Sequence, residues 1–308
     1  MAHQQVFQEE SVQERITLEQ AFEKFRTIYL PAQYASEVTR RGYIYDVQEW
    51  LEQVQTTYVD ELDLDSVQLY FVSGKNLERK GSTRQRKVAA VKAFFHYLEK
   101  TLKILPADFS ARLIWPKVTK DEPRALNKTQ YQAILREAAH DARDSAMLEL
   151  LLQTGIRLSE LTGLTLADVD LPKRPSPDLA TGFGFIRVRR KGGKTQELAL
   201  NYKACRAMSA YLRVRPKSDY PNFFLTKYKT PMTNRSVEKA FKKYARAADV
   251  PWAHVHTFRT THITQHIASG TDIKTVQTNA GHTSLKTTNY YADLVKEAQI
   301  KAMQEHAL

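Results

Sequence analysis

A histidine and an arginine stand three residues apart in HTFRTTHITQHIASG, the segment from His256 to Gly270. Apolar residues recur at helical spacing in this segment, which predicts a largely buried helix with Arg259 near its start. An arginine is always charged, and a buried charge without a partner is strongly unfavourable. We therefore expect an anionic partner at this position, so the chemistry to look for is that of an anion-binding site.

A second arginine occupies a similar place in LLQTGIRLSELTGL. A buried helix is predicted to stop at Thr154 and Gly155 and to restart at Arg157, which puts the guanidinium at a helix start. Such an arginine can offer two parallel N–H bonds to a phosphate, aided by the helix dipole. Glu160, one turn later, is spaced to orient the guanidinium, and an ordinary internal Arg–Glu ion pair is the alternative.

Two guanidiniums and imidazoles around one phosphate would stabilise the charge of a phosphoryl-transfer transition state. That chemistry needs a nucleophile, and GHTSLKTTNYYADL supplies His282 followed by Tyr290 and Tyr291. Adjacent aromatic residues usually pack into a core, so neither tyrosine alone indicates catalysis. Only the combination with the arginines favours a nucleophilic role.

A β-hairpin is predicted in FGFIRVRRKGGKTQELAL, residues 183–200. Apolar and polar residues alternate on both sides of the central glycines, as they do in half-buried strands. Gly192 and Gly193 suit a two-residue turn with positive φ. The hairpin would then carry one lysine at each shoulder, Lys191 and Lys194.

Other motifs fail on inspection. GGKT resembles the end of a phosphate-binding P-loop, but Val188 stands where that motif requires glycine. The four histidines within residues 254–266 lack the cysteines and the spacing of a zinc site, so we expect no metal and no other cofactor. His262 and His266 are predicted to pack or hydrogen-bond within their helix. A single cysteine, Cys205, excludes an internal disulfide.

The elements that must position these residues begin with a small helical domain. Segments with helical periodicity cover residues 18–30, 37–58, 66–77 and 82–102. Ser66 and Ser82 stand where N-caps are expected. The stretch 106–126 has three prolines and no helical period, which indicates a connector. We therefore predict one domain over residues 1–117 and a second over residues 118–308.

The second domain is predicted to be mostly helical around the hairpin. Its helical segments cover residues 127–138, 142–155, 201–215, 233–249, 256–270 and 293–308. Asn127 is the expected N-cap of the first of these segments. The chain as a whole is thus predicted to be mainly α, with a small antiparallel β-sheet in its second domain.

Charge is distributed unevenly along the chain. The formal net charge is +12, and residues 1–120 hold 17 basic and 16 acidic side chains, whereas residues 121–308 hold 29 and 18. Such a basic balance is typical of nucleic-acid partners. One stretch of the first part concentrates cations, and either a solvated helix face or a phosphate-contacting face explains it. Its basic residues are Lys75, Arg79, Lys80, Arg84, Arg86, Lys87 and Lys92.

The motifs taken together resemble those of the tyrosine recombinases, the family of phage integrases, Xer-type resolvases and transposon recombinases. TGIRLSEL, the lysine-bearing hairpin, HTFR and GHTSLKTTNYY follow one another in the family's order and spacing. The resemblance covers nearly the whole chain, since the helical first part ending in IWPK is similar to the family's core-binding domain. Two positions depart from the pattern: Thr260 replaces a common histidine, and Ala280 replaces a leucine that often precedes the Gly-His pair.

The resemblance implies a role for each residue of the central motifs. Arg157 and Arg259 match the two arginines that hold the scissile phosphate, and Tyr291 matches the nucleophile. The implied intermediate is a 3′-phosphotyrosyl link between the protein and DNA.

The remaining positions match groups that move protons or bind the phosphate. Lys191 matches the general acid that protonates the leaving 5′ oxygen, with Lys194 as the alternative. His256 would assist proton transfer, and His282 would hydrogen-bond the phosphate. The expected DNA contacts are the first domain's basic stretch and, on the hairpin, Lys194.

Site-specific recombination is the implied activity, which serves integration, excision or resolution of DNA by a two-domain recombinase of the Xer or mobile-element kind. The expected partners are double-stranded DNA with specific sites, accessory DNA-bending proteins and a homotetramer joined through the C-terminal tail. The alternatives are a type IB topoisomerase-like relaxing enzyme and an architectural DNA-binding protein without catalysis. No apolar run reaches membrane-helix length and no signal peptide is evident, so we expect a cytoplasmic, nucleoid-associated protein without a membrane partner.

Overall fold

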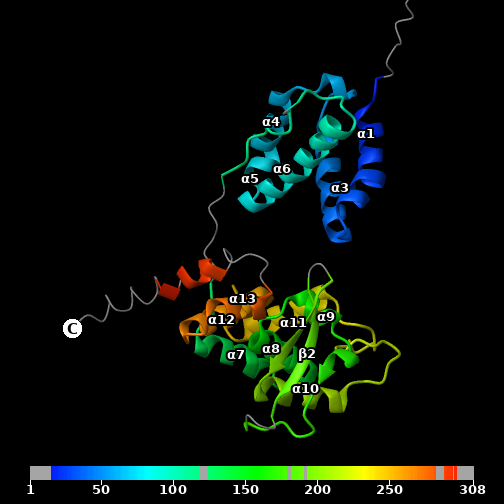
Figure 1. Ribbon diagram of the computed structural model, residues 1–308. Helices are drawn as coiled ribbons and strands as arrows, with labels where there is room; N and C mark the ends of the chain where they lie inside the picture. Colours follow the sequence, from blue (N-terminus) through cyan, green and yellow to red (C-terminus); the bar gives the residue numbers. More distant parts are fainter. Residues whose placement is uncertain are drawn as a thin grey trace, which may run out of the picture. The chain divides into compact units, whose positions relative to one another are not determined.

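A computed structural model of the chain describes residues 15–107, 109–117, 124–178, 182–190, 193–281, 288–293 and 295–296. The chain forms two compact units that divide between residues 121 and 122. Figure 1 shows a helical unit in blue and cyan and a second unit, green to red, that contains the strands. The prediction of a mainly helical chain with a small antiparallel sheet is confirmed.

The first unit packs its helices around an aromatic core. Its helices are α1 (Leu18–Lys24), α2 (Leu30–Gln33), α3 (Glu37–Leu51), α4 (Leu64–Val72), α5 (Gly74–Glu78) and α6 (Gly81–His96). Short π-helical segments, Phe25–Tyr29 and Tyr97–Thr101, extend α1 and α6. Phe25, Trp50 and Phe94 are fully buried, and each such ring adds a large apolar area to the core.

Some predicted local features of the first unit are wrong. Ser66 is not an N-cap, because the carboxylate of Asp63 caps α4 by accepting from the backbone N of Ser66 at 2.9 Å. Ser82 is not one either, since α6 already begins at Gly81. The single helix predicted over residues 66–77 is divided into α4 and α5.

The second unit is arranged around helix α8. Its helices are α7 (Lys128–Ala138), α8 (Ala142–Thr154), α9 (Leu158–Gly163), α10 (Tyr202–Val214), α11 (Asn234–Ala247), α12 (Val255–Ala268) and α13 (Ile273–Ala280). Helices α7, α10 and α12 pack on α8, whose leucines are buried in one core. Asn127 caps α7 as predicted, with its side chain accepting from the backbone N of Gln130 at 2.9 Å. Helix α13 had no counterpart in the sequence prediction.

The sheet has three antiparallel strands in the order β1 (Val169–Asp170), β2 (Gly184–Arg189) and β3 (Thr195–Leu200). Ile186 lies opposite Leu198 and both are buried, so the predicted alternation is confirmed. Gly192, one of the two residues of the predicted turn, lies outside the described residues. The backbone N of Arg190 donates to Lys194 O at 2.7 Å, and Gly193 takes the expected positive φ, +77°.

Among the described residues, no helix combines the length and the apolar character that crossing a bilayer would require.

Candidate active site

The turn between α8 and α9 positions the first arginine. Gly155 ends α8 with φ +62°, and a Cβ at this position would lie 2.6 Å from Cδ2 of His262. A glycine is therefore required both by the left-handed backbone and by the close approach of α12. The chain then turns, and Arg157 takes the N-cap position of α9. The predicted stop and restart of the helix is confirmed.

Glu160 fixes Arg157 and the start of α9 together. One carboxylate oxygen of Glu160 accepts from Nη1 of Arg157 at 2.9 Å, and the other accepts from the backbone N of Arg157 at 2.8 Å. Glu160 is buried, whereas 37% of the Arg157 side chain is exposed. The guanidinium is thus held from inside the protein while part of it faces outward.

Arg259 lies deeper, with only 4% of the residue exposed. Its Nη1 donates to Gly155 O and its Nη2 to Ala280 O, each at 2.5 Å. Burial, followed by the charge of Arg157, lowers the pKa of Arg259 to about 10, and the nearby phenol of Tyr291 opposes this shift. The group remains protonated at neutral pH, and its hydrogen bonds go to neutral acceptors.

The C-terminal end of α13 collects the donors of the site. The four consecutive carbonyl oxygens of residues 278–281 each accept from a different side chain. In the order of the carbonyls, the donors are Gln196 at 3.0 Å, Arg190 at 2.7 Å, Arg259 at 2.5 Å and Arg157 at 2.6 Å. The negative end of the helix dipole therefore faces three guanidiniums.

His256 stands in the first turn of α12 with its outer surface exposed. Partial desolvation, then the charges of Arg259, His254 and Arg157, lower the pKa of His256 below its ordinary value. More of the imidazole is then neutral at neutral pH, the form that accepts a proton. Both arginines and His256 line one cavity of about 640 Å³, together with Trp252.

Tyr291 belongs to the second unit's smaller apolar cluster. It is 6% exposed and packs with Ile263 of α12 and Val276 of α13. Residues 288–293 are helical, and the neighbouring Tyr290 is 37% exposed. The two tyrosines thus differ in environment, and Tyr291 is the one whose phenol lies near Arg259.

Two predicted catalytic residues, Lys191 and His282, lie outside the described residues, as do Leu294 and residues 297–308 of the predicted tail. Lys194 is described and exposed. The predicted site residues that the structure brings together are Arg157, Glu160, His256, Arg259 and Tyr291.

Sequence reasoning missed Arg190. Its side chain is 8% exposed, and its Nη1 donates to Oε2 of Glu160 at 2.7 Å. A signal was available, because the alternation that buries Ile186 and Val188 puts residue 190 on the same face. Helix α13 was missed too, although Asp272 and Gly281 are suitable capping residues at its two ends.

The basic stretch of the first unit is only partly exposed. Lys87 is 1% exposed, and its Nζ lies 2.6 Å from Oε2 of Glu49 and 3.5 Å from Oδ1 of Asp46. An ammonium enclosed by two carboxylates of α3 is poorly placed to reach a phosphate, so we propose that Lys87 belongs to the core of this unit and does not contact DNA. Arg79 pairs with Glu49, and Arg86 pairs with Asp46.

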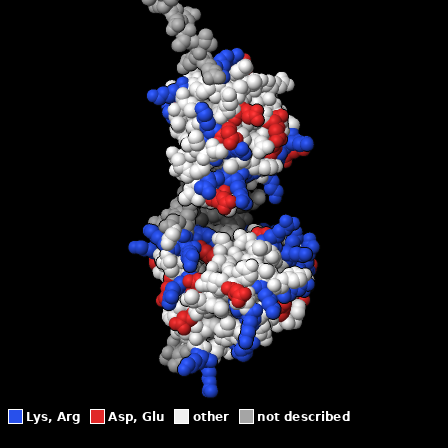
Figure 2. Space-filling view, turned by 90° about the vertical axis from the view of Figure 1, so that its right-hand side faces the viewer, with Lys and Arg blue, Asp and Glu red and all other residues white. Residues whose placement is uncertain are grey.

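The other basic residues of this stretch differ in exposure. Lys75 and Lys80 are exposed, whereas Arg84 is half-buried. Nζ of Lys92 lies 5.6 Å from the ring centre of Trp115. Figure 2 shows mixed acidic and basic side chains on one face of the first unit, and broader basic groups on the second. Contact of these residues with DNA stays a prediction.

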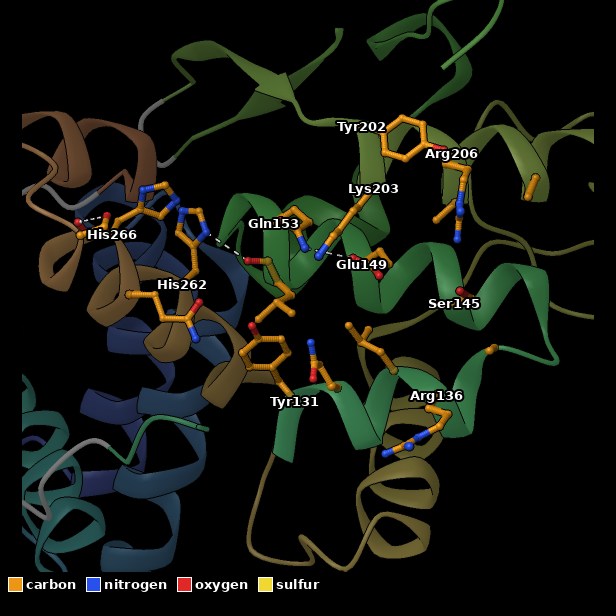
Figure 3. A pocket seen from close by; sticks show the side chains of 18 residues that line it. Tyr131, Arg136, Ser145, Glu149, Gln153, Tyr202, Lys203, Arg206, His262 and His266 are labelled. Atoms are coloured by element: carbon orange, nitrogen blue, oxygen red, sulfur yellow. Dashed lines mark hydrogen bonds between the residues drawn. The ribbon is translucent and has the colours of Figure 1, made fainter. Parts of the chain in front are cut away.

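A separate cavity of about 800 Å³ lies between α7, α8, α10 and α12, with His262 and His266 at one end and Arg206 at the other (Figure 3). Nδ1 of His262 lies 3.0 Å from Leu152 O, which confirms the prediction of a hydrogen-bonded helix residue. Burial, then the neighbouring His266, lowers the pKa of His262 to about 4. The described residues that line this cavity include no member of the predicted catalytic set.

No group of three or more His, Cys, Asp or Glu side chains within the described ranges is arranged to hold a metal ion.

Known protein families match both units. The model of the phage integrase family matches residues 124–298, and that of the phage integrase N-terminal SAM-like domain matches residues 23–101. The tyrosine recombinase XerC of Corynebacterium glutamicum is 29% identical over 277 residues, which cover 88% of this chain and 86% of that protein. The tyrosine recombinase XerC of Roseiflexus castenholzii is 30% identical over 246 residues, 76% of this chain and 75% of that protein.

A solved lambda integrase tetramer bound to a Holliday junction has a similar fold. The TM-score is 0.70 at 12% identity, and the match covers 91% of this chain and 78% of that one. Because the family model matches more than half of the chain, the protein belongs to the phage integrase family. Its activity is that of a tyrosine-type site-specific DNA recombinase, in line with its XerC relatives.

Proposed function

We propose that Arg157 and Arg259 bind the scissile phosphate of a DNA strand and that Tyr291 attacks it. One observation carries this proposal: both guanidiniums donate to adjacent backbone carbonyls at the end of α13. Carbonyls are neutral acceptors, so a phosphate would gain stronger, charge-assisted hydrogen bonds from the same donors. Glu160 holds the Arg157 guanidinium in position at the end of α13 while the phosphate is bound.

The chemical step is a displacement at phosphorus. The phenol oxygen of Tyr291 forms a bond to phosphorus as the bond to the 5′ oxygen breaks, which leaves a 3′-phosphotyrosyl link and a 5′ hydroxyl. A phenol is almost fully protonated at neutral pH, so its proton must leave during attack, and the neutral imidazole of His256 is the acceptor that we assign. The two arginines stabilise the charge that develops on the non-bridging oxygens.

The leaving group needs a proton, because an alkoxide is a poor leaving group in water. We assign this step to Lys191, with Lys194 as the alternative, and we assign to His282 a hydrogen bond to the phosphate. The scheme uses no metal or other cofactor, since guanidiniums supply the positive charge that a metal supplies elsewhere. The assignments of Lys191 and His282 rest on the family pattern in the sequence.

Strand exchange follows from the same chemistry. The 5′ hydroxyl of a second duplex attacks the phosphotyrosyl link, rejoins the strand and releases Tyr291, so no bond energy is lost to hydrolysis. The partners are double-stranded DNA, bound by both units, and three further copies of the chain, joined through the tail after Tyr291. The fold shared with the lambda integrase tetramer on a Holliday junction supports this assembly.

Covalent trapping tests the proposal. Denaturing capture of protein-linked fragments from host DNA first identifies a site, and a nicked duplex of that sequence then traps the intermediate. We expect a protein–oligonucleotide adduct with the wild type and with Tyr290→Phe, the matched control, and none with Tyr291→Phe. An adduct that persists in Tyr291→Phe, or none with the wild type, would contradict the proposal.

A further inference from the structure

A third guanidinium lies beside the two that we assign to the phosphate. Arg190 follows the last residue of β2, and its three guanidinium nitrogens reach three different elements. Nη1 donates to Glu160 of α9 at 2.7 Å, Nη2 to Asn279 O of α13 at 2.7 Å, and Nε to Oε1 of Gln196 of β3 at 3.0 Å. A planar fork with rigidly placed donors is suited to such a three-way contact, and a lysine is not.

The end of α13 is shaped to receive this side chain. A Cβ on Gly281 would lie 2.8 Å from both Cζ and Nε of Arg190, so the guanidinium occupies the space that any other residue would fill. Nε2 of Gln196 also donates to Thr278 O at 3.0 Å. Two parallel bridges, one from Arg190 and one from Gln196, therefore join the hairpin to α13.

The Arg190 bridge lies next in the sequence to groups that the proposed mechanism uses. Arg190 immediately precedes Lys191, and Gly281 immediately precedes His282. We propose that Arg190 is a positioning residue that clamps the β2–β3 hairpin to the end of α13 and so sets the backbone from which Lys191 protonates the leaving oxygen. This inference rests on the proposed function, because it assigns Arg190 a part in that reaction.

A substrate that needs no general acid separates this role from a structural one. In such a duplex sulfur replaces the bridging 5′ oxygen, and the thiolate leaves without being protonated because thiols are far more acidic than alcohols. We expect Arg190→Met to slow cleavage of the ordinary duplex about 10²-fold, the cost of misplacing a catalytic group by about 1 Å. On the sulfur-containing duplex the variant should cleave at nearly the wild-type rate.

Two further variants accompany this measurement. Gln196→Ala removes the second bridge and the partner of Arg190 Nε, but it leaves the Arg190 contacts with Glu160 and Asn279 O. It should slow cleavage of the ordinary duplex less than Arg190→Met does, and it should likewise cleave the sulfur-containing duplex at nearly the wild-type rate. Arg187→Met is the matched control, because Arg187 lies on the same strand and is exposed, and its ion pair within the described part of the chain is with Glu197 across the hairpin at 3.6 Å. It should cleave both duplexes at the wild-type rate. Thermal unfolding of each variant checks its folding.

The outcomes are distinguishable. A wild type that forms no adduct on either duplex contradicts the proposed function itself. In another outcome the wild type cleaves, and Arg190→Met slows cleavage of the ordinary and the sulfur-containing duplex equally. Arg190 would then act through Glu160 and Arg157 or through folding, and this result overturns the inference. An Arg190→Met variant as fast as the wild type overturns it as well. If Arg190→Met does not fold, the ratio measured for Gln196→Ala decides.

Discussion

The two units both bury basic side chains, but they balance the charge differently. In the first unit Arg79, Arg86 and Lys87 share two carboxylates, those of Asp46 and Glu49. Lys87 is enclosed, the two arginines stay partly exposed, and the three cations exceed the two carboxylates by one charge. Such a cluster ties α6 to α3, and it offers little charge to a ligand.

In the second unit three guanidiniums face one carboxylate among the described residues. Arg157 and Arg190 pair with Glu160. The other contacts are to neutral acceptors: Nε of Arg190 donates to Oε1 of Gln196, and the remaining donors, including those of Arg259, go to backbone carbonyls. Carbonyls at a helix end carry only partial negative charge, so the positive charge of the three guanidiniums is not fully balanced at the C-terminal end of α13. The carboxylates that the fold brings to the basic residues, rather than the number of basic residues, therefore distinguish an anion site from an internal network.

The largest effect should come from Arg259→Gln. Removing one of two phosphate-binding guanidiniums should slow cleavage about 10³-fold, because it removes charge stabilisation from the transition state. Single-turnover adduct formation on the trapped duplex measures this loss. Arg246→Gln, on the exposed face of α11, is the control and should be unaffected. A loss of less than about tenfold would mean that Arg259 does not bind the reacting phosphate.

In the first unit, Lys87→Met should lower stability, whereas Arg259→Gln in the second unit should lower the cleavage rate. Burial raises the pKa of Asp46 even with Arg86 and Lys87 opposing it, so removing one cation leaves a poorly compensated buried carboxylate. We expect the free energy of unfolding to fall by about 3 kcal/mol in urea denaturation.

The affinity of the folded Lys87→Met variant for DNA should remain unchanged. This result distinguishes a structural role of Lys87 from a role in DNA binding. Lys75→Met, at an exposed position, should change stability by less than about 0.5 kcal/mol. Unchanged stability together with weaker DNA binding by Lys87→Met would contradict the assignment of Lys87 to the core.

Acid should destabilise the second unit through His262. Its pKa in the folded protein is about 4, below the ordinary value of 6.5, so the unfolded chain binds more protons between these values. Stability should therefore fall as the pH drops from 6.5 towards 4, by up to about 3 kcal/mol. Urea denaturation across this range should show a smaller pH dependence for His262→Asn. The same slope in the variant would rule out His262 as the source.

The smallest effect is expected for Lys80→Gln on the exposed part of the basic stretch. If Lys80 meets one phosphate, the slope of log affinity against log salt should decrease by about 0.9, with little change in stability. Titrations of DNA at several salt concentrations measure the slope. An unchanged slope would remove Lys80 from the DNA-contacting face.

Features set by neighbours in the sequence could be predicted. The alternation of residues 183–200 gave the strands, and Gly155 followed by Arg157 gave the helix restart, because both depend on local backbone preferences. The order of the motifs then gave the family. Strand β1 could not be predicted in the same way, since its two residues form a strand only by pairing with β2.

Features set by distant residues could not be predicted. The burial of Lys87 depends on carboxylates about 40 positions earlier in the chain, and periodicity within α6 does not reveal them. The clamp at Arg190 likewise depends on Glu160 and on carbonyls at the end of α13, a helix with little apolar signal of its own. Charge compensation is a property of the fold, so a sequence shows which residues carry charge but not which of them remain uncompensated.

In the proposed mechanism, excess positive charge in the second unit holds a phosphate for attack by one tyrosine. Mass spectrometry of peptides from the trapped adduct tests this role most directly, after nuclease has trimmed the DNA to a single nucleotide. We expect a nucleotide joined through its 3′ phosphate to Tyr291 and an unmodified Tyr290. A nucleotide attached to Tyr290, or to any residue other than Tyr291, would contradict it.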